Sequence, residues 1–446
     1  MPIAKYLDIL DDLLARARKA GADAADALVV EGASLTVAER LGRPEKLERA
    51  EGQDLGLRVF LGKRQALVSS TDFSSKALDE LAARAVAMAK VVPEDPFCGI
   101  AEPGEIATSV PDLDLCDPDE PSTEALIERV RTGEAAARAV PGVTNSEGAE
   151  ASWGRSKMAL AASNGFRQGY AGSHSGLSVS VVAGEGTGMQ RDYDFTSAVY
   201  GSELEDPASV GRRAGEKAVK RLDPRKVATV KVPVVFDPRV ANGLIGHLTG
   251  AINGASIARG ISFLKDKLGE RIFPAGLDIV EDPLRRRGLR SAPFDGEGLP
   301  TSRRNLVADG VLTTWVLDLR SARQLGLKST GNAARGTSGP PSPTTRNLHL
   351  EPGPLSPAEL MADIASGFYC TELIGMGVNN VTGDYSRGAA GFWIENGEIA
   401  YPVAEITIAG NLKEMFLNLT PANDLVFRYG TNAPTTRVDG MTVAGR

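Results

Sequence analysis

The sequence predicts an α+β fold spread over more than one domain, and three observations support this. The chain has 446 residues, whereas a single hydrophobic core stops growing at roughly 250–300 residues. Hydrophobic residues make up 42% and charged residues 24%, as in soluble globular proteins. Segments with a helical period alternate with strand-like runs that end in tight turns. We therefore expect a mixed α/β N-terminal domain, a middle domain of a β-meander plus helices, and a C-terminal domain rich in strands and hairpins.

The N-terminal domain is expected to cover residues 1–121. It begins with a helix over 2–20, whose apolar residues recur at alternating spacings of four and three and so share one face. Gly21 directly after it is a suitable C-cap. A proline-rich linker over 93–121 ends the domain. Between helix and linker we expect strands at 27–30, 35–38, 55–60 and 65–69 and a second helix at 74–90.

The middle domain is expected to cover residues 122–228. Two helices flank a meander of long strands, because alternating apolar and polar residues run between two segments of helical period. The segment GEGTGM at 184–189 has the glycines of a phosphate loop, but no helix follows it, so a turn is the better interpretation. The expected helices are 123–139 and 207–221, and the expected strands are 143–152, 155–164, 167–183 and 188–200.

The C-terminal domain is expected to cover residues 229–446. A buried strand at 232–236 precedes a glycine-rich helix at 238–252, and a capped helix is expected at 357–365. Asp309-Gly310 and Asn396-Gly397 each separate two strand-like runs, which is typical of type I′ hairpin turns. Residues 331–347 show no apolar period and predict a long surface loop of the kind that often serves as a lid.

Charge and cysteine content narrow the classes of function. The net charge of −7 disfavours a nucleic-acid partner, although Arg285–Arg287 is a local basic run; a solvated turn is the simpler interpretation of that run. Three scattered cysteines predict a reducing cytosol and no disulfide framework. No stretch approaches 18 uninterrupted apolar residues and the N-terminus does not resemble a signal peptide, so we expect a cytoplasmic protein without a membrane partner.

Histidines are too few for an obvious metal centre. His174, His247 and His349 show no spacing of a metal motif, and no CxxC is present. His247 is interpreted as a packed helix residue or an interface residue, and His349, between two leucines, as an exposed strand position. In GDYSRG at 383–388, Ser386 and Arg387 are candidate peptide-binding residues that form a carboxylate clamp, or simply residues of a hairpin corner.

Four stretches carry a resemblance to a known family. They are GLIGHLTGAINGAS (243–256), APFDGEG (292–298), DGVLTTWVLDLRSARQLGLKSTGNA (309–333) and TGDYSRGAAGFWIENGEIAYPVAEITIAGNLKEMF (382–416). They resemble the PmbA-type (TldE-type) branch of the TldD/PmbA family, whose members were also named modulators of DNA gyrase. The resemblance covers most of the chain and is strongest from residue 230 onward.

The resemblance implies a role in a metallopeptidase of the bacterial cytosol that acts on unfolded peptides. In this family a TldD-type chain pairs with a PmbA-type chain. The TldD-type chain holds a zinc-type metal on a helix with the motif His-Glu-x-x-x-His, assisted by a cysteine near its C-terminus. A PmbA-type chain would accordingly have a TldD-type partner and unfolded peptide as substrate.

This sequence departs from the metal-binding motif. Alignment on the shared glycine of that helix places Gly246, His247 and Ala251 at the three motif positions, and residues 424–446 contain no cysteine. Gly246 and Ala251 have no ligand atom, and His247 replaces the acid that would activate water. We therefore expect no catalytic residue, no metal and no cofactor in this chain, which would support the TldD-type partner and line its substrate tunnel.

Two alternatives remain at this stage. The chain could be a stand-alone homodimer that binds peptides or a regulator without cleaving them, because the glycine-rich helix suits close contact between helices in either assembly. It could also be an independent hydrolase, for which Ser386 would be the first residue to mutate.

Overall fold

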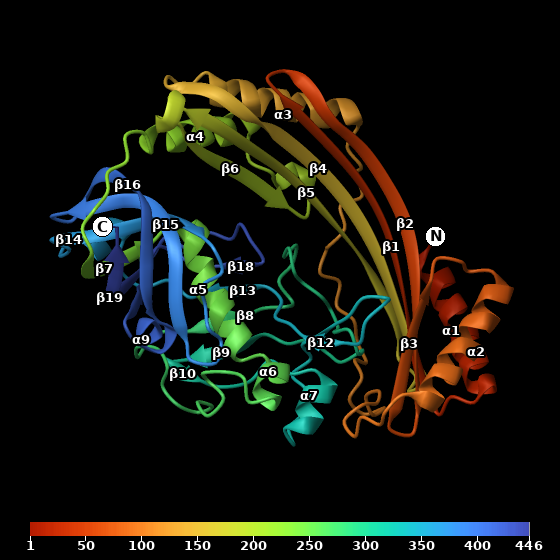
Figure 1. Cartoon of the computed structure of the whole chain (residues 1–446). Coiled ribbons are helices and arrows are strands. Elements are labelled where there is room, and N and C mark those ends of the chain that lie inside the picture. The colour runs from red at the N-terminus through yellow and green to blue at the C-terminus, as the bar shows by residue number, and fades with distance from the viewer. Residues whose placement is uncertain (446) are drawn as a thin grey trace.

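The computed structural model describes residues 1–445, and its first half is built on one six-stranded antiparallel sheet (Figure 1). Strands of both the expected N-terminal and the expected middle domain pair within this sheet, where β1 lies directly beside β4. The strand order is β3-β2-β1-β4-β5-β6, with bounds β1 Ala24–Arg40, β2 Arg43–Leu61, β3 Arg64–Ser70, β4 Val143–Ala162, β5 Arg167–Ala183 and β6 Gln190–Ala198.

Three strands are longer than the sequence pattern predicts. Residues 27–30 and 35–38 belong to the single strand β1, and 143–152 and 155–162 belong to β4. The strand predicted at 55–60 is the end of β2, which begins at Arg43. The middle of β1 carries Gly32 and Ser34 and is only half-buried, because no helix covers this part of the sheet. The alternation of apolar and polar residues is therefore absent in the middle of β1, although its backbone pairs with β2 and β4 along this stretch.

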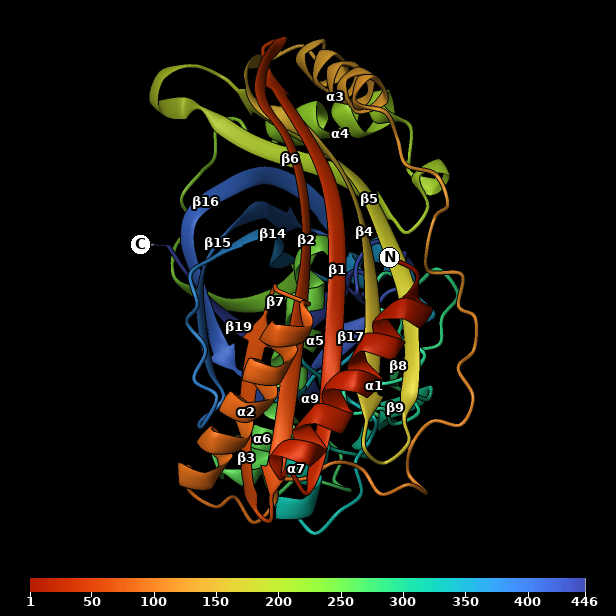
Figure 2. The same cartoon turned by 90° about the vertical axis from the view of Figure 1, so that its right-hand side faces the viewer.

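Four helices cover one face of this sheet in two pairs, one at each end (Figures 1 and 2). One pair packs on Ala27 and Val29 of β1 and the other on Leu35 and Val37. Because successive residues of a strand point to opposite faces, these four odd-numbered side chains share one face. The first pair is α1 Ile3–Ala20 with α2 Ser75–Val91, and the second is α3 Thr123–Arg138 with α4 Pro207–Lys220.

The C-terminal half contains two further sheets. In the larger one the order is β16-β15-β14-β7-β19-β17, and an additional pairing between β16 and β19 closes the strands into a small barrel. Its strands are β7 Val230–Phe236, β14 Ser366–Ile374, β15 Asp384–Glu395, β16 Glu398–Asn411, β17 Leu419–Pro421 and β19 Thr436–Ala444. The smaller sheet has the order β10-β9-β8-β13-β18, with β8 Ile279–Glu281, β9 Arg304–Ala308, β10 Val311–Leu312, β13 Leu348–Leu350 and β18 Thr431–Asn432.

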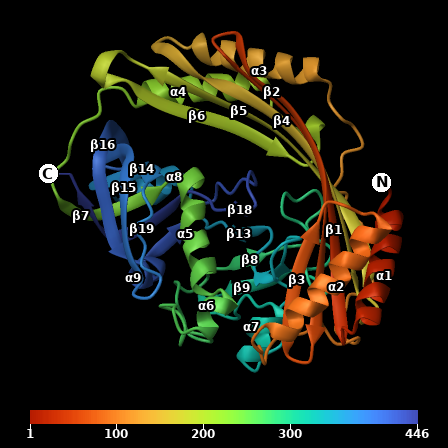
Figure 3. The same cartoon turned by 45° about the vertical axis from the view of Figure 1, so that its right-hand side comes forward.

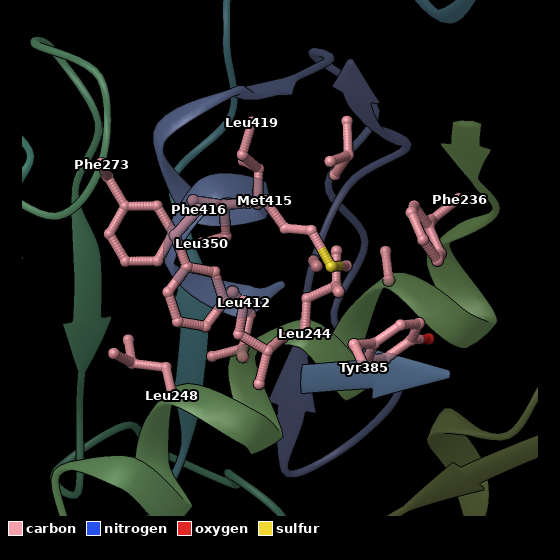
Figure 4. Close-up of a cluster of buried hydrophobic side chains, with 14 of the residues drawn as sticks. Phe236, Leu244, Leu248, Phe273, Leu350, Tyr385, Leu412, Met415, Phe416 and Leu419 are labelled. Carbon is pink, nitrogen blue, oxygen red and sulfur yellow. The ribbon is translucent and has the colours of Figure 1, made fainter. Parts of the chain in front are cut away.

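A single large core holds this half together (Figure 4). Leu244 and Leu248 of α5 meet Phe236, Tyr385 and the aromatic pair Phe273 and Phe416, whose ring centroids lie 4.7 Å apart. The helices around the core are α5 Pro238–Ala251, α6 Gly254–Ala258, α7 Leu319–Gln324, α8 Pro357–Met361 and α9 Leu412–Leu417. No helix within residues 1–445 is long and apolar enough to cross a membrane.

The predicted fold class is confirmed, and so are both hairpin turns. Asp309 and Gly310 have φ values of 49° and 76°, and Asn396 and Gly397 have 50° and 84°. Positive φ at both central residues defines the type I′ turn, which only a few residue types adopt without strain. The turns join β9 to β10 and β15 to β16.

The loop at 331–347 differs from its prediction as a surface loop. Asn332 and Ala333 are buried, and the short strands β11 Ala333–Ala334 and β12 Ser342–Pro343 form a hairpin. This hairpin packs against the N-terminal sheet, where a Cβ on Gly56 would lie 2.3 Å from the carbonyl oxygen of Thr337. Residues 331–333 are buried because this part of the loop lies where the sheet arches over the C-terminal half, whereas Gly336, Ser338 and Pro340 are exposed (Figure 3).

Candidate functional site

Helix α5 has one bare face. Asp237 caps it by accepting a hydrogen bond from the Arg239 N–H, and its apolar side lies in the core. The other side carries Gly243, Gly246 and Gly250, and a Cβ built on any of the three meets no atom within 4 Å. This face of α5 is therefore open backbone without side chains.

The three positions of the metal-binding motif do not converge in this chain. Gly246 is exposed on the bare face, whereas Ala251 is 1% exposed in the core and points away from it. The two histidine positions of the motif are five residues apart, at Gly246 and Ala251. Neither residue has a side-chain atom that could bind a metal ion.

His247 is half-buried at the edge of the bare face. Its ring lies edge-on to the Tyr385 ring, with the centroids 5.7 Å apart. Burial and then the positive charge of Arg387 lower the pKa of His247, so the imidazole is neutral near pH 7. The buried Tyr385 hydroxyl has no hydrogen-bond partner within the described residues. His247, Tyr385 and Arg387 thus form one cluster beside α5.

Ser386 does not join this cluster. Side chains alternate along β15, so Ser386 points away from the face shared by Tyr385 and Arg387. Ser386 is exposed, and its N–H donates to the Gly377 carbonyl. Arg387 donates from Nε to the Ile374 carbonyl at 3.3 Å. The structure therefore places the two candidate peptide-binding residues on opposite faces of the strand.

The residues present do not fit a resident metal ion. Within residues 1–445, no group of three or more His, Cys, Asp or Glu side chains lies close enough together to hold one. His174 is exposed on β5, with its ring over Gly154. The prediction that His349 is exposed is wrong, because β13 lies between β8 and β18 and buries it to 8% exposure. Its Nε2 atom is 3.3 Å from Glu351 Oε1.

Two neighbouring cavities lie beneath the arch of the sheet. One, of about 480 Å³, is lined by Ser34, Gly154 and His174, which directly oppose one another on the face without helices. The other, of about 600 Å³, is lined by the run Arg285–Arg287 and by the segment 427–432. Both cavities include Gly288 and Leu289 in their walls. Sequence analysis missed this hollow because its walls come from segments far apart in the chain.

A buried charge network attaches the N-terminal sheet to the C-terminal half. Asp26 of β1 forms ion pairs with Arg58 of β2 and with Arg335 of the 331–347 loop, and all three side chains are almost fully buried. Glu297 lies 3.9 Å from Arg58, and Asp295 accepts three backbone N–H bonds nearby. Burial raises the pKa of Glu297 well above that of an ordinary glutamate. Asp295 and Glu297 belong to APFDGEG (292–298), one of the four stretches that carry the family resemblance.

Comparison with family models covers almost the entire described chain. Residues 25–89 match domain 1, residues 116–222 match the central domain, and residues 229–445 match the C-terminal domain of the PmbA/TldA metallopeptidases. The metalloprotease PmbA of Escherichia coli O157:H7 is 41% identical over 95% of this chain and 93% of its own length. A PmbA homolog of Haemophilus influenzae is 36% identical over 96% of this chain and 94% of its own.

Solved structures share the whole fold. A Bacteroides thetaiotaomicron protein described as a modulator of DNA gyrase superposes with a TM-score of 0.90 at 26% identity, over 98% of each chain. TldE from Thermococcus kodakarensis superposes with a TM-score of 0.88 at 22% identity, over 98% of this chain and all of its own. At that identity the second likeness concerns the fold alone.

Proposed function

Because the chain belongs to the PmbA/TldD family, we propose that it is the metal-free, PmbA/TldE-like subunit of a two-chain metallopeptidase that degrades or processes unfolded peptides. Its role is to support a TldD-type catalytic chain and to line the passage of the substrate. The observation that carries this proposal is the bare face of α5, where the motif position Gly246 and its neighbour Gly250 have no side chain.

The names of the relatives raise the question of where the metal is held. The two PmbA relatives are named metalloproteases, and that activity needs a metal ion with ligands and an activated water. The residues of this chain do not fit such a site, so we assign the metal to the partner. The contribution of this chain is then a wall of the substrate passage and no step in the chemistry.

The shape of the chain suits an unfolded substrate. The hollow beneath the arched sheet is confined between two halves of the molecule, and the bare α5 face allows close approach of another backbone. An extended peptide has unpaired backbone N–H and C=O groups. Such surfaces can form hydrogen bonds with them whatever the sequence of the peptide.

An apolar surface beside α5 suits the partner. Ile374 at the end of β14, and Met376 and Val381 on the segment that joins β14 to β15, are 61%, 92% and 58% exposed. Several exposed apolar side chains on one short segment are typical of a protein contact surface. We assign this surface to the TldD-type chain and place the assembly in the bacterial cytosol.

The test is cleavage of an unstructured peptide by the purified chain alone, by the TldD-type chain of the same organism alone, and by the mixture. We expect cleavage in the mixture and none by this chain, whose metal content stays far below one ion per chain. Met376→Asp places a charge on the surface assigned to the partner and should lower cleavage by the mixture. Met88→Asp, at an exposed methionine on α2, is the matched control and should leave cleavage unchanged. Cleavage by this chain alone, or one bound metal ion per isolated chain, would contradict the proposal.

A further inference from the structure

The cavity of about 600 Å³ has a basic wall that the proposed function does not use. It lies between the end of β6, the turn 285–289 and the segment 427–432. Its volume falls within the range of about 300–1,000 Å³ that is usual for ligand sites. Arg286 is exposed, as expected of a solvated turn, but Arg285 and Arg287 are half-buried.

Two of the three arginines are neutralised within the protein. Asp114 accepts hydrogen bonds from Arg286 Nη2 at 3.0 Å and from Arg287 Nε at 2.6 Å. Glu203 accepts a further bond from Arg287 Nη1 at 2.6 Å. The Arg287 guanidinium also stacks on the ring of Tyr200. Two carboxylates therefore balance Arg286 and Arg287.

Arg285 is not neutralised in this way. Its guanidinium carbon lies 3.4 Å from the centroid of the Phe427 ring, and within residues 1–445 the side chain makes no hydrogen bond or ion pair. The nearby Asp282 carboxylate attracts this guanidinium without bonding to it, and accepts a hydrogen bond from the Leu284 N–H at 3.1 Å. Stacking fixes the guanidinium plane while its N–H groups remain free to donate in that plane. The cavity thus holds one guanidinium that stacks on an aromatic ring and has no hydrogen-bonded carboxylate.

We propose that this cavity binds the C-terminal carboxylate of an extended peptide, with Arg285 donating two parallel N–H bonds to its oxygens. The proposal rests on the proposed function, because it takes unfolded peptide as the substrate class. A guanidinium fork matches a carboxylate in geometry and in charge. Leu289, Phe427 and the ring of Tyr429 provide apolar surface for the last side chains of the peptide.

The charge balance favours a carboxylate over a phosphate. A carboxylate carries one negative charge and matches the one guanidinium of this run that lacks a bonded carboxylate. A phosphate dianion would bring a second charge close to Glu203, which also lines the cavity. Burial raises the pKa of Tyr429 to about 12, so its hydroxyl keeps its proton and is a further donor for the same anion.

The experiment compares two versions of one unstructured peptide, with a free C-terminal carboxylate and with a C-terminal amide. Both carry a fluorophore at the N-terminus, and their affinity for the full chain without partner is measured by anisotropy. We expect the acid to bind about tenfold or more tightly than the amide. Arg285→Gln removes this difference by lowering affinity for the acid most, and Arg285→Lys keeps only part of the difference because the fork is lost.

The matched control is Arg290→Gln. It removes the same charge as Arg285→Gln, but Arg290 is exposed and does not line the cavity. This variant keeps the preference for the acid. Equal affinity of the wild-type chain for both peptides, or an equal loss in Arg285→Gln and Arg290→Gln, overturns the proposal. Competition by inorganic phosphate, with both peptides bound equally, identifies an anion site unrelated to peptide ends and overturns it too.

These results are independent of the test of the proposed function. Cleavage by the mixed chains with no preference for the acid removes the carboxylate site and leaves the subunit role standing. A preference for the acid without cleavage by the mixture supports the carboxylate site and contradicts the subunit role.

Discussion

Arg335 and Asp26 form a buried ion pair across 309 positions of the sequence, with the two side chains 1% and 4% exposed. Asp26 lies on the first strand of the N-terminal sheet, and Arg335 lies on the loop of the C-terminal half that packs beneath it. The pair therefore holds the arch over the C-terminal half at the end opposite to β6.

Replacing Arg335 should weaken this attachment. Arg335→Met removes one partner of a buried pair, and because Asp26 keeps Arg58 we expect a loss of about 3 kcal/mol in the free energy of unfolding. Denaturant unfolding measures the loss, and hydrogen exchange should rise in 331–347. Arg286→Gln breaks a pair whose arginine is 75% exposed, and we expect less than about 1 kcal/mol. Equal effects of both substitutions would refute a special role for the buried pair.

The stability of the protein should depend on the proton of Glu297. Burial raises the pKa of Glu297 in the folded state, whereas the unfolded chain titrates at the ordinary glutamate value. Between these two pKa values the folded state binds a proton that the unfolded state lacks. The contribution of Glu297 to the free energy of unfolding is therefore fully present below the pKa of the unfolded state. It is lost as pH rises through the pKa of the folded state, by at most about 1.4 kcal/mol per pH unit.

Thermal unfolding over a pH series across neutrality measures this dependence. Glu297→Gln should flatten the decline of the melting temperature with rising pH. Glu80→Gln removes an exposed acid and should keep the wild-type slope. A Glu297→Gln variant with an unchanged slope would show that the glutamate is ionised in the folded protein.

The bare face of α5 should tolerate side chains that other glycine positions reject. Gly246→Ala has open space and should stabilise the helix by about 1 kcal/mol. Gly254→Ala is the matched control on α6, where a Cβ would lie 2.8 Å from the Val316 carbonyl oxygen, and we expect a cost of about 1–3 kcal/mol. Melting temperatures separate the two.

A large side chain on the same face tests the role of α5 in the assembly. Gly246→Trp should leave the fold of this chain intact but lower the rate of peptide cleavage by the mixture with the TldD-type chain, since it fills the surface that we assign to the passage. A rate equal to that of the wild-type mixture, with normal pairing of the chains, would move the passage away from α5.

The cluster beside α5 should respond to the charge of Arg387. Burial and Arg387 both lower the pKa of His247, so Arg387→Gln should raise this pKa toward the ordinary value. Histidine NMR signals report the titration. His349 is the internal control, because its charged neighbours are Glu351, Arg303 and Arg285. An unmoved His247 signal would show that the guanidinium is too far from the ring to matter.

The sequence by itself determined the features that depend on neighbours along the chain. The helix at 2–20, with its C-cap Gly21 at φ 107°, and the two Asn/Asp-Gly turns were predicted because each follows from contacts within a few residues. The missing ligand atoms at Gly246 and Ala251 were predicted for the same reason, since a residue type is a local fact.

Only the tertiary structure decided what distant segments do together. The joining of β1 to β4 in one sheet, the bond between Arg335 and Asp26, and the burial of His349 each depend on partners more than 60 positions away. Ser386 and Arg387 are neighbours in the sequence but face apart, because a strand alternates its side chains. Arg285 differs from Arg286 for a similar reason. The fold places the carboxylate of Asp114 beside the Arg286 guanidinium and the ring of Phe427 beside that of Arg285, and no local sequence pattern indicates which partner each one has.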